Sequence, residues 1–129
     1  MVLDASGAIE LLLNTAAGKR LSARLADESE AVHVPHLIDM EIAQVLRRYV
    51  RHGMLPERTG ALALERWRSL DVERYSHELF LGRVWQLRDN LTAYDAVYIA
   101  LAEALSTVLV TGDRKLVGAP RVGVAIELI

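Results

Sequence analysis

Several acidic residues stand at positions where an isolated carboxylate would be costly to bury. Asp4 ends the apolar run MVLD, Asp113 follows the apolar run TVLVTG, and Asp95 is the only charged residue in LTAYDAVYIALA. In the helical pattern HLIDMEIAQVLRRYV, both Asp39 and Glu41 fall within the apolar arc, so periodicity places an acid inward without choosing between them. Carboxylates buried together repel one another and need a common cation. Oxygen ligands favour Mg²⁺ or Mn²⁺, so the sequence predicts a site for a hard divalent cation.

Each of these acids also has a purely structural interpretation. Thr92 and Asp95 have the spacing of a capping box at a helix start, where a carboxylate also suits the helix dipole. Asp113 in TGDR fits a turn, and Asp4 fits a helix cap. The local patterns alone therefore leave both interpretations open.

The composition limits the class of protein. The chain has 129 residues, no cysteine and a formal net charge of −2, without a long run of one sign. Disulfides and thiolate metal sites are therefore excluded. Because no basic segment precedes the apolar start and no stretch is long enough to span a membrane, we expect a soluble cytoplasmic protein with one domain over residues 1–129.

Short β-rich runs alternate with helical patterns along the chain. The alternation predicts an α/β fold, in which a parallel sheet carries helices on both faces. We expect strands at 1–4, 31–35, 70–75, 106–113 and 121–128, and helices at 5–14, 19–28, 36–53, 56–70, 77–90 and 91–105. Gly18 is expected to separate the first two helices, and Ser76 and Thr92 to cap the last two.

In open α/β sheets the functional site lies beyond the carboxyl ends of the strands. Asp4 and Asp113 both follow strands and are expected there. Asp95 lies in the first turn of the helix that precedes the strand ending at Asp113. We therefore expect Asp95 at the end of the sheet opposite Asp4 and Asp113, unless the start of its helix bends back.

Four motifs, VLDAS, DMEIAQVLRR, LTAYDAVYIALAEAL and VLVTGDRKL, resemble in order and separation the PIN domain, and specifically the VapC toxins of bacterial toxin-antitoxin pairs. The resemblance covers essentially the whole chain. It implies a parallel sheet of strand order 3-2-1-4-5, a homodimer, and a VapB-type antitoxin as partner. It also brings Asp95 to the pocket and selects Glu41 over Asp39.

The resemblance further implies an Mg²⁺- or Mn²⁺-dependent endoribonuclease whose metal-activated water cuts RNA to leave a 5′-phosphate and a 3′-hydroxyl. Its metal-binding acids would be Asp4, Glu41, Asp95 and Asp113. Among them, Asp4 and Asp113 are assigned to direct coordination, and Asp95 and Glu41 to coordinating or orienting the bound water. Ser6 and Thr111 match the hydroxyl positions that support the first and last acids.

An acidic pocket repels RNA, so basic residues must border it. Arg114 and Lys115 adjoin Asp113 and are the best candidates, and Lys19, Arg20 and Arg24 are candidates for an outer rim. Tyr94 and Tyr98 lie in so apolar a helix that core or dimer-interface positions are expected for both. For the antitoxin, we expect an Arg or Lys inserted among the acids, with an amphipathic stretch packed on grooves between helices.

Two other classes of function compete with the nuclease. A phosphoacceptor receiver would need an acidic pair after the first strand, where only Asp4 stands, and an Asp after the third strand, whereas Asp71 precedes it. A catalytically silent PIN-like binding module would lack part of the acid set, which is intact here.

Overall fold

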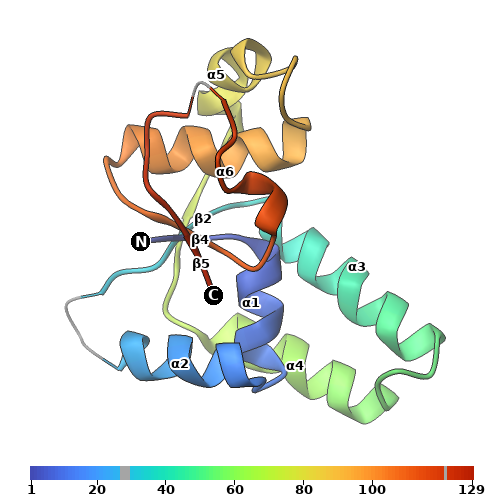
Figure 1. Ribbon diagram of the computed structural model, residues 1–129. Coiled ribbons are helices and arrows are strands. Elements are labelled where there is room, and N and C mark those ends of the chain that lie inside the picture. The colour runs from blue at the N-terminus through green and yellow to red at the C-terminus, as the bar shows by residue number, and fades with distance from the viewer. Residues whose placement is uncertain (27–29, 121) are drawn as a thin grey trace.

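Five parallel strands form the central sheet of the computed structural model, in the order β3-β2-β1-β4-β5 (Figure 1). The structure describes residues 1–26, 30–120 and 122–129. The strands are β1 (Val2–Leu3), β2 (His33–Pro35), β3 (Glu73–Tyr75), β4 (Leu109–Thr111) and β5 (Ile126–Leu128). The predicted order is confirmed, and it differs from the 2-1-3-4-5 order of receiver-type folds, which weighs against that alternative.

Helices cover both faces of the sheet, as predicted. On one face α6 (Ala93–Ala104) packs against β1, β2 and β4 and carries α5 (Leu81–Gln86) (Figure 1). On the other, α1 (Ala5–Leu12) contacts β4 and packs against α2 (Ala16–Leu25), α3 (Ile38–Arg51) and α4 (Glu57–Ser69). Two short 3-10 helices, η1 (His77–Phe80) and η2 (Arg114–Leu116), complete the described elements.

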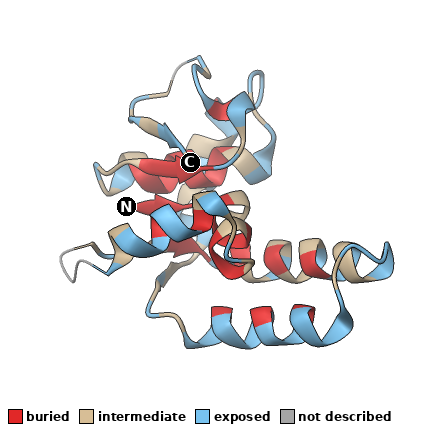
Figure 2. Cartoon of the chain, turned by 60° about the horizontal axis from the view of Figure 1, so that its bottom comes forward, coloured by how far each residue is buried: buried red, intermediate tan, exposed pale blue. Residues whose placement is uncertain are grey.

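The core lies between the sheet and these two helical layers, as the burial colouring of Figure 2 shows. Val2 and Leu3 of β1 and Leu109 and Val110 of β4 are almost completely buried, because central parallel strands are covered on both faces. The middle of α6, Ala96 to Ala102, is buried all around, which explains its uninterrupted apolar sequence. The apolar runs of the sequence therefore form the centre of the fold.

The hairpin of α3 and α4 extends away from the sheet, and its two helices pack against each other (Figures 1 and 2). Gly53 ends α3 with a positive φ of 69°, and Pro56 is the N-cap of α4, so the predicted ends of both helices are confirmed within a few residues. A Cβ on Gly60 would come within 2.9 Å of Val50, so the helices cross closely there.

Gly18 has a different role from the one predicted. It lies inside α2, which begins after the N-cap Thr15, whose hydroxyl accepts from the Gly18 N–H at 3.1 Å. A Cβ on Gly18 would lie 1.9 Å from the carbonyl oxygen of Glu10, so only glycine allows α2 to approach the end of α1 this closely. The expected helix positions 27 and 28 lie outside the described residues.

The predicted helix over 77–90 is wrong in its extent. It divides into η1 and α5, followed by a turn over residues 87–90, and Ser76 makes no side-chain cap. Leu87 is completely buried, and its carbonyl accepts from the N–H groups of Asn90 and Leu91. This turn leads the chain to Thr92, where α6 begins. The last strand is also shorter than predicted, and residue 121 of that prediction lies outside the described residues.

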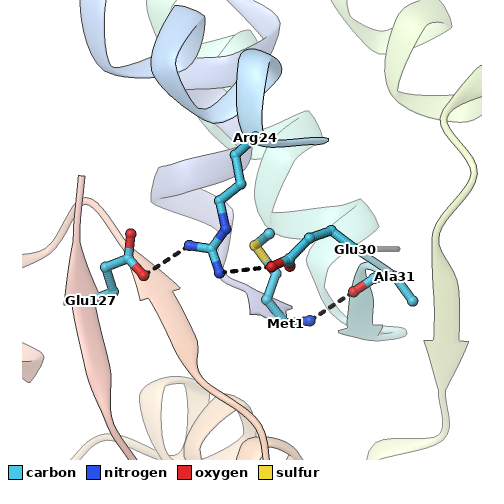
Figure 3. A network of polar contacts seen from close by, with 5 residues as sticks. All are labelled: Met1, Arg24, Glu30, Ala31 and Glu127. Atoms are coloured by element: carbon cyan, nitrogen blue, oxygen red, sulfur yellow. Dashed lines mark hydrogen bonds and ion pairs between the residues drawn. The ribbon is translucent and has the colours of Figure 1, made fainter. Parts of the chain in front are cut away.

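Arg24 joins three segments near the start of the chain (Figure 3). Its guanidinium donates to Glu127 of β5 at 2.8 Å and to Glu30 at 3.3 Å, while the amino group of Met1 donates to the Ala31 carbonyl at 2.7 Å. The network ties α2 to the edge of the sheet. None of the helices in the described ranges has the length and apolar character needed to cross a membrane.

Candidate functional site

Asp4 follows β1 and is the N-cap of α1, a junction that turns the chain from strand to helix. Its side chain is only 6% exposed. One carboxylate oxygen accepts from the Gly7 N–H at 2.8 Å, and the other accepts from the hydroxyl of Thr111 at 2.6 Å. The capping interpretation of Asp4 is therefore confirmed, but a cap uses one oxygen only, and the second faces the end of β4.

Ser6 and Thr111 orient the Asp4 carboxylate. The Ser6 hydroxyl donates to Asp4 (2.7 Å to Oδ1), and because it accepts from the Gly112 N–H at 2.7 Å its proton is directed toward the acid. Thr111 Oγ1 likewise accepts from the Asp113 N–H at 2.9 Å while donating to Asp4. Backbone donors thus fix both hydroxyls.

Asp113 lies next to this group, after β4, as the N-cap of η2. Its Oδ1 accepts from the Lys115 N–H at 2.9 Å, so the turn interpretation is confirmed as a local feature. The charge of Asp113 also disfavours ionisation of Asp4, so the carboxylates are close enough to interact. The carboxyl ends of adjacent strands therefore bring Asp4 and Asp113 together, as the sequence predicted.

Helical periodicity could not decide between Asp39 and Glu41 of α3, but the structure gives them different partners. Asp39 accepts from the indole Nε1 of Trp67 at 2.6 Å and pairs with Arg74, whose Nε lies 3.1 Å from Oδ2. Glu41 instead accepts from the hydroxyl of Tyr98 on α6. Asp39 thus connects α3 to α4 and β3, whereas Glu41 faces the start of α6.

Asp95 begins α6 as the capping-box pattern predicts. The Thr92 hydroxyl donates to Asp95 Oδ2 at 2.7 Å and accepts from the Asp95 N–H at 3.1 Å. The negative charge of Asp95 also acts on Glu41. The topological argument that placed Asp95 at the far end of the sheet is therefore wrong, and the family-based expectation that it reaches the other acids agrees with the structure.

Burial and mutual repulsion govern the electrostatics of this cluster. Burial raises the pKa of Asp4, and the Asp113 charge adds to the rise, while hydrogen bonds from Gly7, Thr111 and Ser6 oppose it. Burial also raises the pKa of Glu41, as do the charges of Asp4 and Asp95, against the Tyr98 hydrogen bond. No ion pair to any of these acids occurs in the described part of the chain. The four acids, which we term the acid cluster, hold uncompensated negative charge.

The ligand chemistry of the acid cluster fits a hard divalent cation, since carboxylates and hydroxyls supply only oxygen. The cluster consists of two pairs, Asp4 with Asp113 and Glu41 with Asp95, coupled through the charges of Asp4 and Glu41. Over the residues that the structure describes, no three Asp, Glu or His side chains converge closely enough to hold a metal ion as they stand. A metal bound here would require these side chains to move closer together.

The surface next to Asp113 is basic, whereas the surface next to Glu41 is mostly apolar. Arg114 and Lys115 are exposed on η2 beside Asp113, where the sequence analysis expected phosphate contacts. On the other side, a cavity of about 640 Å³ adjoins Glu41. Its lining is mostly apolar and consists of Ala5, His36, Leu37, Met40, Glu41, Gln44, Val45, His77 and Tyr94.

The two tyrosines of α6 have different environments, although sequence reasoning treated them alike. Tyr94 is 66% exposed and lines this cavity, so a core position is wrong for it. Tyr98 is 3% exposed and donates its hydroxyl proton to Glu41, a contact that the sequence analysis missed. The available signal was its spacing of three residues from Asp95, which places both on one side of the helix.

Comparison with known proteins identifies relatives. The model of the PIN domain family matches residues 1–122. Ribonuclease VapC9 of Mycobacterium tuberculosis is 47% identical over 116 residues, which cover 90% of this chain and 87% of that protein. Ribonuclease VapC12 of the same organism is 36% identical over 129 residues, covering 100% and 98% of the two chains.

Solved structures share the fold. PAE2754 from Pyrobaculum aerophilum superimposes with a TM-score of 0.70 at 26% identity, covering 98% of this chain and 81% of that one. VapBC2 from Rickettsia felis, solved with a DNA fragment of its promoter, gives a TM-score of 0.72 at 13% identity, covering 98% and 96%. At that identity the second likeness concerns the fold alone.

Proposed function

This chain belongs to the PIN-domain family and is a VapC-type ribonuclease of a toxin-antitoxin system, and from that premise we propose that its acid cluster is the active site. In this proposal Asp4, Glu41, Asp95 and Asp113 are the catalytic acids, acting with Mg²⁺ or Mn²⁺ within one PIN domain over residues 1–129. The observation that carries it is a buried Asp4 whose carboxylate is oriented by fixed donors, yet has only acids as charged neighbours.

Asp4, Asp95 and Asp113 would hold the cation, and Glu41 would contact it directly or through bound water. When bound, a divalent cation neutralises charge, makes water more acidic and stabilises the in-line displacement at a phosphodiester. Ser6 and Thr111 keep both Asp4 oxygens oriented before substrate arrives, which avoids reorganisation during the reaction. Glu41, whose pKa is raised by burial and by its acidic neighbours, is suited to orient the attacking water and to accept its proton.

Substrate binding requires positive charge beside the acid cluster. The exposed Arg114 and Lys115 on η2 would contact RNA phosphates next to Asp113. Of the outer candidates, Arg24 is already paired with Glu30 and Glu127, so it contributes to the fold rather than to this surface. The proposal therefore places the RNA path across η2.

The test is cleavage of a single-stranded RNA by the purified protein with Mg²⁺ and with excess chelator. We expect cleavage only with the metal, and products that carry a 5′-phosphate and a 3′-hydroxyl. Cleavage that persists in chelator and leaves a cyclic phosphate would contradict the metal mechanism. A protein that binds RNA without cutting it would match the silent binding module.

A VapB-type antitoxin would control this activity in the cytoplasm. The groove between α3 and α4 offers an apolar floor with Arg47, Arg51 and Glu57 among its lining residues, in a cavity of about 280 Å³. An amphipathic antitoxin segment fits such a groove. We propose that an antitoxin Arg or Lys enters the acid cluster, where an Arg pairs with two carboxylates and replaces the metal.

Competition between metal and peptide tests this mode of inhibition. Peptide inhibition should weaken as Mg²⁺ increases at constant ionic strength, because the Arg and the metal use the same negative charge. Inhibition independent of Mg²⁺ would instead indicate steric blocking of the RNA path.

A homodimer is also proposed. Leu79 of η1, Leu81 and Trp85 of α5, and Tyr94 of α6 are large apolar or aromatic side chains that are more than half exposed, as is Met40 of α3. So many exposed apolar groups on one protein are typical of an association surface. Sedimentation of the wild type and of Trp85→Ser tests it, with a shift toward monomer expected for the variant.

A further inference from the structure

Tyr98 connects the separate segments that carry the acid cluster. Its hydroxyl donates to Glu41 of α3, and the Ala5 backbone N–H, one residue after Asp4, lies near the same oxygen. On its own helix, Tyr98 lies three residues after Asp95. One phenolic oxygen thus lies where the start of α1, α3 and α6 meet.

The ring and the hydroxyl of Tyr98 have separable roles. The ring is part of the core and needs only apolar neighbours. Within the described residues, the hydroxyl is the only hydrogen-bond partner of the Glu41 side chain, whereas Asp4 has donors from three residues. Burial and the Glu41 charge both raise the pKa of Tyr98, so the phenol keeps its proton and remains a donor.

Without the hydrogen bond from Tyr98, the Glu41 side chain would be expected to turn away from the other acids of the acid cluster. Its side chain borders the open cavity that also contains His36 and Gln44. The charges of Asp4 and Asp95 repel its carboxylate. A single directional donor therefore decides which way this flexible side chain points.

We propose that Tyr98 is a positioning residue, which holds the Glu41 carboxylate beside Asp4 and Asp95 and so completes the ligand environment of the divalent cation. The inference depends on the proposed function of the acid cluster. It assigns Tyr98 a role through Glu41 and no contact with RNA.

The experiment measures Mn²⁺ binding directly, by the loss of the electron paramagnetic resonance signal of free Mn²⁺, in wild type, Tyr98→Phe, Glu41→Gln and the double variant. Tyr98→Phe retains the ring and removes only the donor. Loss of a group that orients a metal ligand weakens metal affinity about 10- to 100-fold, and we expect a loss in this range. Because Tyr98 acts through Glu41, the double variant should bind Mn²⁺ no more weakly than Glu41→Gln.

Tyr49→Phe is the matched control. Tyr49 lies on α3 two turns after Glu41, packs against the core and has Arg48 over its ring. Its substitution should leave Mn²⁺ affinity unchanged, and thermal unfolding monitors the fold of every variant. RNA cleavage by Tyr98→Phe should show a lower kcat with little change in the KM for RNA.

The outcomes separate the inference from the proposed function. Wild-type affinity for Mn²⁺ in Tyr98→Phe would overturn the positioning role, as would a loss that persists at full size in the Glu41→Gln background. Equal Mn²⁺ binding by wild type and Asp4→Asn would instead show that the acid cluster is not the metal site, which removes the proposed function itself.

Discussion

Beside the start of the chain, the carboxylates of Glu30 and Glu127 flank the guanidinium of Arg24 (Figure 3). In the acid cluster, by contrast, Asp4 after β1 and Glu41 on α3 face other acids. A third region resembles the first. Glu103 of α6 receives two hydrogen bonds from Arg83, at 2.6 and 2.8 Å, and one from the Gly123 N–H.

The pKa of Glu103 moves in the opposite direction from the pKa values of Asp4 and Glu41. The hydrogen bonds from Arg83 lower the pKa of Glu103, whereas burial raises the pKa of Asp4 and of Glu41. A lowered carboxyl pKa means that the ionised form stabilises the fold, and a raised one means that ionisation costs stability. The paired acids therefore hold elements together, and the acid cluster retains a charge that a bound cation can neutralise.

The largest expected effect is on catalysis. Asp4→Asn and Asp113→Asn should each reduce Mg²⁺-dependent RNA cleavage by about 100-fold or more, since direct metal ligands contribute several kcal/mol to the transition state. Asn can still cap α1, and one repelling charge is removed, so Asp4→Asn should unfold at the same or higher denaturant concentration.

Asp71→Asn is the matched control for these variants. Asp71 is an exposed acid before β3, and its substitution changes the net charge equally. It should leave cleavage unchanged. Near-normal activity in either Asp4→Asn or Asp113→Asn would show that the ligand assignment is wrong.

A pair of variants on one helix sharpens the comparison. Glu41→Gln should lower kcat about tenfold or more, because Gln cannot accept the proton of the attacking water. Asp39→Asn should leave kcat unchanged and cost less than about 1 kcal/mol of stability, through its partly exposed pair with Arg74. Steady-state kinetics and urea unfolding distinguish the two, and the reverse pattern would mean that α3 presents the other acid to the substrate.

A divalent cation should stabilise the folded protein through the unpaired acids of the acid cluster and not through acids that are already paired with Arg. At Mg²⁺ ten times above its Kd, the free energy of unfolding of the wild type should rise by about 1.4 kcal/mol. Asp4→Asn should show much less of this rise, whereas Glu103→Gln should show all of it. Thermal unfolding over a Mg²⁺ series checks this, and equal stabilisation of all three proteins would place the metal elsewhere.

The smallest effect is the pH dependence of the paired region. The folded-state pKa of Glu103 is lowered, so its contribution to stability is present above its unfolded-state pKa and is lost as the pH falls. Its partner is partly exposed, so Glu103→Gln should cost about 0.2–1 kcal/mol at neutral pH and nothing in acid. Asp4 and Glu41 act in the opposite sense: their contribution is greatest in acid and is lost as the pH rises.

Most of the fold followed from local patterns. The alternation of short apolar runs with amphipathic helices predicted the parallel sheet, and the residues after β1 and β4 predicted the pairing of Asp4 with Asp113. The role of Gly18 could not be predicted from its neighbours in sequence. Glycine is required at this position because the backbone of α1 leaves no room for a Cβ. The end of α5 at Gln86 was also missed, and it coincides with the complete burial of Leu87, a tertiary feature.

The sequence by itself determined which residues carry charge, which segments are buried, and the caps at Asp4 and Thr92, because these depend on neighbours within a few positions. Helical periodicity left Asp39 and Glu41 equivalent, the family resemblance favoured Glu41, and the tertiary structure shows the partners that separate them. Only the tertiary structure decided that Tyr98 rather than Tyr94 contacts an acid. Helical periodicity places a side chain on an arc, whereas the partner of Glu41 lies on α6 at a sequence separation of 57 positions. Long-range packing of this kind is fixed by the whole core and leaves no local signal.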